Sequence, residues 1–243
     1  MDHLITAQPL DLLSKLERVI EDSAEFLARY DISIKKGISA KSREVFLQWP
    51  TARLRKTISN AKRILDVHLE AERLPHFNLD DGAALLKIAL LELGLGVDSE
   101  FFKTLDRSDI IELYDVDHIQ IFRSFNFFRI CNYSLDEVLA YEWFELYERE
   151  ELVTHQILAE LEAFAKSNAS IGKWKVREHL MRERFTDAHA VNMTHFKAYA
   201  RVYSGPEQLA GFITTIRAKP LGEYLNEFRF IRPHRSKTHF KKP

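Results

Sequence analysis

Three kinds of side chain in this sequence could carry chemistry, and their spacing favours binding over catalysis. Cys131 is the single cysteine and lies in a predicted helix, where a free cysteine is usually a buried, unreactive side chain. Glu145, Glu148 and Glu151 are spaced three apart, as on a solvent-exposed helix face, with no buried partner evident that would shift a carboxyl pKa. The sequence has no glycine-rich phosphate loop, no Gly-x-Ser-x-Gly elbow and no His-Glu-x-x-His pair. We therefore predict that the protein is not an enzyme.

Asn192 and Thr194 could hold a ligand because of their place in a predicted strand, residues 189–203. Alternate side chains of a strand point to the same face. The even-numbered positions from 190 to 202 are small or apolar except for these two. A cavity above that face would use Asn192 and Thr194 as its hydrogen-bonding groups. A packed core with small residues opposite aromatic side chains gives the same pattern, so both interpretations stay open.

Charge is segregated along the chain, although Lys plus Arg total 35 and Asp plus Glu total 36. Residues 35–63 hold nine basic residues and one acid, a net charge of +8, whereas residues 136–162 hold nine acids and one base, a net charge of −8. Blocks of like charge commonly mark interaction surfaces. We predict that the basic block, with Arg53, Arg55 and Lys56, contacts protein, either within the chain or across a dimer. The alternative is nucleic-acid binding by this block, assisted by the basic residues 228–243.

Composition describes an ordinary globular chain of 243 residues, with 46% apolar and 29% charged residues. One cysteine excludes an intramolecular disulfide framework and favours a reducing compartment. The longest apolar run, residues 83–97, is too short to span a bilayer and is interrupted by Lys87 and Glu92. We expect a cytoplasmic protein without a membrane segment.

The elements that must position these residues fall into two groups. Helical periodicity predicts helices over residues 9–30, 39–49, 51–73 and 82–93, so residues 1–107 are expected to be all-helical. Strand patterns follow at 110–114 and 118–123, then short helices, a longer helix ending near residue 168, and strands at 173–184, 189–203 and 208–218. This order predicts an α+β fold: a helical N-terminal region, then a five-stranded antiparallel sheet with helices on one face. Residues 220–243 are expected to form a short helix and a basic tail.

Residues 108–219 resemble the PAS domain family in two sequence motifs as well as in the order of their helices and strands. Residues 132–139 read Asn-Tyr-Ser-Leu-Asp-Glu-Val-Leu and residues 143–147 read Trp-Phe-Glu-Leu-Tyr. These phrases are similar to the ones that open the helices after the first hairpin in that family. Ser124 stands where the family commonly has Asn. The resemblance implies a sensory domain that perceives a ligand or contacts another protein.

The resemblance also bears on cofactors. Some PAS proteins bind haem through a histidine on the longest helix, and His155 is the candidate, although a half-exposed helix histidine is the simpler interpretation. Flavin photochemistry is not expected, because residues 142–150 lack the cysteine that such relatives use. A ligand would lie between the sheet and the helices that carry Trp143 and His155, with Asn192 and Thr194 bonded to it.

These observations together predict a signalling protein whose PAS-like domain perceives a small ligand or mediates a protein contact. No further output domain fits in the remaining residues, so the signal is expected to pass through the N-terminal helices or a separate partner. The stripe Leu12, Leu16, Val19 and Phe26 predicts a homodimer, and a helix folded back onto its own chain stays open. The alternative is a nucleic-acid-binding transcriptional regulator that uses residues 35–63 under PAS control.

Overall fold

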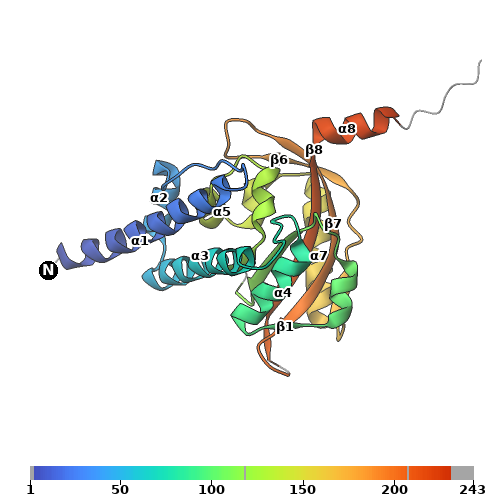
Figure 1. Cartoon of the computed structure of the whole chain (residues 1–243), viewed down its shortest axis with the longest axis horizontal. Coiled ribbons are helices and arrows are strands. Elements are labelled where there is room, and N and C mark those ends of the chain that lie inside the picture. The colour runs from blue at the N-terminus through green and yellow to red at the C-terminus, as the bar shows by residue number, and fades with distance from the viewer. Residues whose placement is uncertain (1–2, 118, 207, 231–243) are drawn as a thin grey trace, which may run out of the picture.

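Four helices form the N-terminal region of the computed structural model, which describes residues 3–117, 119–206 and 208–230 (Figure 1). Two of them begin at side-chain caps: the Ser42 N–H donates to Ser39 Oγ at 3.1 Å, and the Ala84 N–H donates to Asp81 Oδ1 at 3.0 Å. Gly94, with φ of +63°, ends the fourth helix in the left-handed conformation. The four predicted helices are confirmed, and they are α1 (His3–Ala28), α2 (Ala40–Gln48), α3 (Thr51–Glu72) and α4 (Gly82–Leu93).

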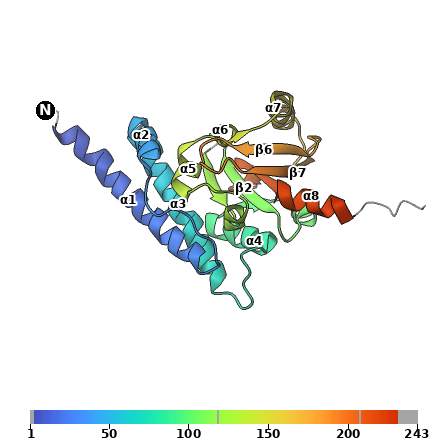
Figure 2. The ribbon, with the colours of Figure 1, turned by 90° about the horizontal axis from the view of Figure 1, so that it is seen from above.

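The apolar stripe of α1 is buried within the chain. Leu12, Leu16, Val19 and Phe26 are at most 9% exposed, and α1 packs along α3 (Figure 2). These side chains therefore contribute to the chain's own core, and the predicted homodimer would have to use other surfaces. The basic tail expected after α8 (Leu221–Phe230) lies outside the described residues.

The sheet is antiparallel and curled, and its strand count corrects the prediction of five. Six strands follow the order β3-β2-β8-β7-β6-β4, and two more, β1 and β5, pair with β7. The eight are β1 (Gly96–Val97), β2 (Ile110–Asp115), β3 (Gln120–Arg123), β4 (Tyr147–Glu148), β5 (Ile171–Lys173), β6 (His179–Glu183), β7 (Val191–Tyr203) and β8 (Leu209–Pro220). β1 also shows that residues 1–107 are not all-helical, as does the 3₁₀ helix η1 (Ser99–Thr104).

The length of β7 explains the additional strands. Its 13 residues pair with β8 along one edge and with β6, β5 and β1 in succession along the other. The predicted single strand 173–184 is therefore two strands, separated where β7 bulges between Phe196 and Ala198. At that place the Trp174 indole Nε1–H donates to Thr214 Oγ1 at 3.0 Å. The Trp174 side chain, 9% exposed, is therefore buried where the two strands are separated.

Helices cover both faces of the sheet, which corrects the prediction of a single face. α7 (Glu151–Lys166) lies on one side with α5 (Leu135–Ala140) and α6 (Trp143–Leu146), and α4 lies on the other (Figure 2). A Cβ on Gly82 of α4 would lie 3.1 Å from Ile111 Cδ1, so this helix begins directly against β2. Alternate residues of β2 are buried on both faces, as expected of a covered strand.

One continuous core joins the helical region to the sheet. His68 of α3 is 0% exposed and stacks on Phe125 of the 3₁₀ helix η2 (Phe125–Arg129), with ring centroids 3.9 Å apart. Its Nδ1 lies 2.7 Å from the Ile64 carbonyl oxygen, and the Phe125 N–H donates to its Nε2 at 3.1 Å. These two bonds fix a neutral imidazole with the proton on Nδ1. The core therefore extends across the predicted boundary near residue 107.

Candidate ligand cavity

A cavity of about 350 Å³ lies between α7 and the sheet. This volume is within the range of small-molecule sites, and its walls are predominantly apolar, as such sites usually are. The apolar side chains come from β2, η2, α7, β6, β7 and β8 and include Ile110, Phe127, Ile157, Phe164, Met181 and Ile216.

The helix α7 forms the roof of the cavity and is fixed mainly at its ends. At its C-terminal end the Arg201 guanidinium donates to the carbonyl oxygens of Phe164, at 2.8 Å, and Ser167, at 2.6 Å. Such a cation satisfies helix carbonyls that have no partner within the helix. Just before its N-terminal end, Glu150 forms an ion pair with Arg177 at 2.6 Å. Between these points Glu160 Oε2 accepts a hydrogen bond from the Lys175 N–H at 2.9 Å, and the helix lies over the cavity.

One wall of the cavity carries a buried ion pair. Arg123 of β3 is 4% exposed, and its Nη2 lies 2.8 Å from Glu112 Oε1 on the neighbouring strand β2. The Tyr114 hydroxyl donates to the other carboxylate oxygen of Glu112 at 2.9 Å, and burial raises the pKa of Tyr114 so that it stays protonated. The Nε and Nη1 of Arg123 are buried without a hydrogen-bond partner among the described residues.

A second guanidinium lines the same cavity. Arg149, between β4 and α7, lies with its Cζ 5.1 Å from the centroid of the Trp143 ring. Its Nε and Nη1 are likewise buried and have no partner in the part of the chain that the structure describes. Burial lowers the pKa of Arg149 to about 10, which leaves the group positively charged at neutral pH. Glu112 is already paired with Arg123, so Arg149 has no ion-pair partner among the residues that the structure describes.

The structure brings two of the four predicted pocket residues to the cavity wall. Trp143 and Asn192 line it. The Asn192 Nδ2 donates to the Ile130 carbonyl oxygen at 3.0 Å, so a backbone partner already satisfies that amide nitrogen. Thr194 is fully buried on the same strand, and its hydroxyl has no partner within the described residues. Thr194 is not among the lining residues.

His155 does not line the cavity. Its side chain is 70% exposed, and its Nε2 lies 3.5 Å from Glu151 Oε1 on the outer surface of α7. Helix geometry explains the difference, since His155 is two residues, or about 200°, from the buried Val153 and Ile157. The expectation that His155 faces a ligand is therefore wrong, and we do not propose haem ligation through it.

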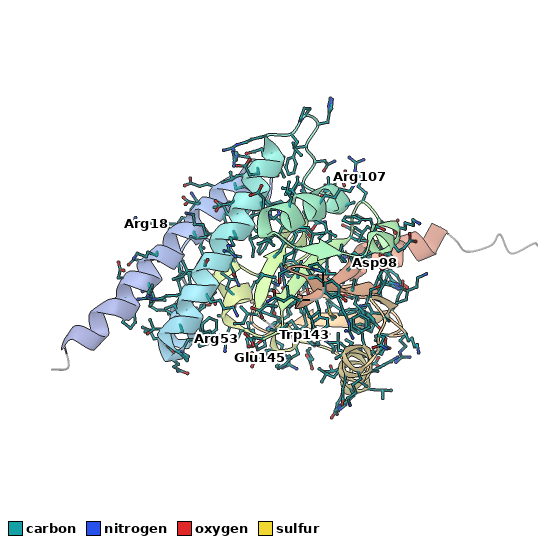
Figure 3. All side chains as sticks on the ribbon, turned by 90° about the horizontal axis from the view of Figure 1, so that it is seen from below. Arg18, Arg53, Asp98, Arg107, Trp143 and Glu145 are labelled. Atoms are coloured by element: carbon teal, nitrogen blue, oxygen red, sulfur yellow. The ribbon has the colours of Figure 1, made fainter. Side chains whose placement is uncertain are left out.

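The three predicted contact residues of the basic block lie in different environments. Arg53 Nη2 lies 2.7 Å from Oε1 of Glu142, the residue just before α6. Arg53 also lies close to Trp143 (Figure 3). Lys56 Nζ lies 2.7 Å from Asp115 Oδ2, and this hydrogen bond raises the pKa of Lys56. Arg55 is exposed, with no ion pair among the described residues. Two of the three thus pair within the chain, and a contact with a separate partner stays a prediction.

Sequence reasoning missed the charged groups of the cavity. Arg149 is the single base among the nine acids of residues 136–162, and that isolation was a usable signal. Glu112 is a charged residue inside a strand that is otherwise apolar or aromatic until Asp115, which indicates a paired carboxylate. Arg123 gave no comparable signal, because its burial depends on the pairing of β2 with β3.

Residues 3–117, 119–206 and 208–230 contain no cluster of His, Cys, Asp and Glu suited to a metal ion. Within the same ranges, no helix has the length and apolar character needed to cross a bilayer. Comparison with protein-family models, with curated proteins and with solved structures finds no match for this chain.

Proposed function

We propose that residues 108–219 form a PAS-like sensor domain of a signalling protein, with a small ligand in the cavity beneath α7. The hairpin β2–β3, the helices that follow it and the strands β6, β7 and β8 stand in the order that the family resemblance implies. The observation that carries the proposal is the cavity itself, about 350 Å³ of mostly apolar space with a few convergent polar groups. We propose no catalytic activity for this domain.

We propose that the signal passes to the N-terminal helices through the contacts that α3 makes with Glu142 and with β3. Arg53 of α3 holds Glu142, whose neighbour Trp143 lines the cavity. The Asn60 side-chain amide also donates to the Gln120 carbonyl oxygen of β3 at 3.0 Å. A ligand that moves Trp143 or β3 would therefore alter contacts of α3, and a signalling partner or a second copy of the chain would detect the change.

Chemical extraction tests the proposal. Protein purified under native conditions should release a small molecule in near-stoichiometric amount when it is unfolded, detected by mass spectrometry of the extract. An absorption spectrum of the folded protein identifies haem or flavin if either is the ligand. The homodimer is tested on the same sample by sedimentation equilibrium, where a mass of 28.4 kDa would exclude it. An empty extract, together with unchanged thermal unfolding across a metabolite library, would contradict ligand perception.

A nucleic-acid-binding regulator is the second candidate, and exposed bases on α3 favour it. Arg55, Lys62 and Arg63 are exposed, and no ion pair of theirs is described in the ranges given above. Phosphate contacts release counterions, so binding to duplex DNA would weaken steeply as salt rises. Binding at physiological salt that is lost when the three residues are changed to Glu would establish this function. Absence of binding at low salt would exclude it.

A further inference from the structure

The charge inside the cavity specifies the chemistry of the ligand. Two guanidinium groups, Arg123 and Arg149, line the cavity, and the facing carboxylate of Glu112 is already bonded to Arg123 and to the Tyr114 hydroxyl. At this wall the lining therefore has one positive charge in excess, because the fourth charged lining residue, Glu162, is 68% exposed and pairs with Lys166 at 2.6 Å. Burying a charge without a partner is unfavourable, so such a group indicates an anionic counterpart.

Two guanidinium groups have buried donors that no described residue uses. Arg123 is 4% exposed, and its Nε and Nη1 have no partner among the described residues. The Nε and Nη1 of Arg149 are buried and similarly unbonded in the described part of the chain. Nε and Nη1 point to different sides of the guanidinium group, so each can donate one hydrogen bond to a ligand oxygen. Trp143 lies against Arg149 and restricts its orientation.

The remainder of the cavity suits an apolar chain. Arg149 precedes the first turn of α7, whereas Phe164 is in its last turn, and both line the cavity. Phe164 packs against Tyr199, with ring centroids 4.5 Å apart, and Trp174 packs against the same tyrosine at 4.6 Å. The 16 residues of α7 span about 24 Å, so the lining extends along an elongated space.

We propose that the ligand is a linear apolar carboxylate, such as a medium-chain fatty acid, with its carboxylate bound by Arg149 and its chain lying beneath α7. This inference rests on the sensor function proposed above and adds the substance class that the cavity recognises. A phosphorylated headgroup would bring a second negative charge that the single excess cation does not balance. A neutral ligand would leave the buried Nε and Nη1 of Arg149 without a charged acceptor.

Titration calorimetry with decanoate and decanol tests the assignment, because the two compounds share a ten-carbon chain and differ in charge. Wild-type protein should bind decanoate at least tenfold more tightly than decanol. Arg149→Gln should weaken decanoate binding at least tenfold and leave decanol binding unchanged. Arg182→Gln is the matched control: Arg182 is exposed on β6, does not line the cavity, and its loss changes the net charge equally.

Equal affinity of the wild-type protein for the two compounds would overturn the carboxylate assignment, and this comparison needs no variant to fold. Undiminished decanoate binding by a folded Arg149→Gln protein would also overturn it. If neither compound binds but extraction yields a different ligand, this inference fails while the sensor function stands. If neither compound binds and the extract is empty, both fail.

Discussion

Mild acid should destabilise this protein through one buried imidazole, His68. Burial lowers the pKa of His68 from 6.5 to about 4. In the unfolded chain the group takes up a proton near pH 6.5, whereas in the folded protein it stays neutral until about pH 4. A depressed histidine pKa therefore gives stability that is complete above pH 6.5 and is lost as pH falls toward 4. At 1.36 kcal/mol per pKa unit, the full loss is about 3 kcal/mol, of which about 2 kcal/mol is lost by pH 5.

Urea unfolding at pH 7.5 and pH 5.0, for wild type and His68→Gln, isolates this contribution. The free energy of unfolding of the wild type should fall between these pH values by about 2 kcal/mol more than that of the variant, since other titrating groups act alike in both. His155→Gln, which changes an exposed histidine, should retain the wild-type pH dependence. If wild type and His68→Gln lose the same free energy at pH 5.0, His68 is not a buried neutral group and the reasoning is refuted.

Three further predictions concern single contacts. Asn192→Leu removes the hydrogen bond that the buried Asn192 amide donates to the Ile130 carbonyl oxygen and should lower the free energy of unfolding by about 1–3 kcal/mol in urea titrations; an unchanged midpoint would show that the amide is dispensable. Arg53→Glu should cost no more than about 1 kcal/mol, because both partners are more than one-third exposed, and adding Glu142→Arg should recover part of it; no recovery in the double variant would mean the pair contributes nothing. Burial raises the pKa of the Cys131 thiol, so iodoacetamide should modify it at pH 8 at least tenfold more slowly than free cysteine; comparable rates would place the thiol in contact with solvent.

The helices and the long strands were predictable because their signals are local. Periodic apolar residues and side-chain caps such as Asp81 define α1 to α4, and alternation defines β7 and β8. The strand count was not predictable in this way. β1, β4 and β5 are two or three residues long, and they are strands only because a neighbouring strand, β7 or β6, offers an edge for pairing.

The candidate site was predictable only in part, for a similar reason. Alternation along β7 correctly put Asn192 on the face toward the cavity, and the helix after residue 142 brought Trp143 there. His155 was misplaced because the rotation of α7 over the sheet was not known, although the buried residues Val153 and Ile157 of that helix set it. The pairing of Arg123 with Glu112 depends on tertiary structure, and no sequence spacing indicates it.

Native mass spectrometry of the wild type, one cavity-filling variant and one surface variant tests the central claim most directly. Leu161 lies on α7 and lines the cavity, whereas Leu152 lies on the same helix, is 73% exposed and does not line it. Wild type and Leu152→Trp should both carry a small molecule that adds to the protein mass, and Leu161→Trp should be free of it, because the larger indole occupies the space. Wild-type protein at its bare mass, or a Leu161→Trp variant that retains the same added mass, would contradict the account.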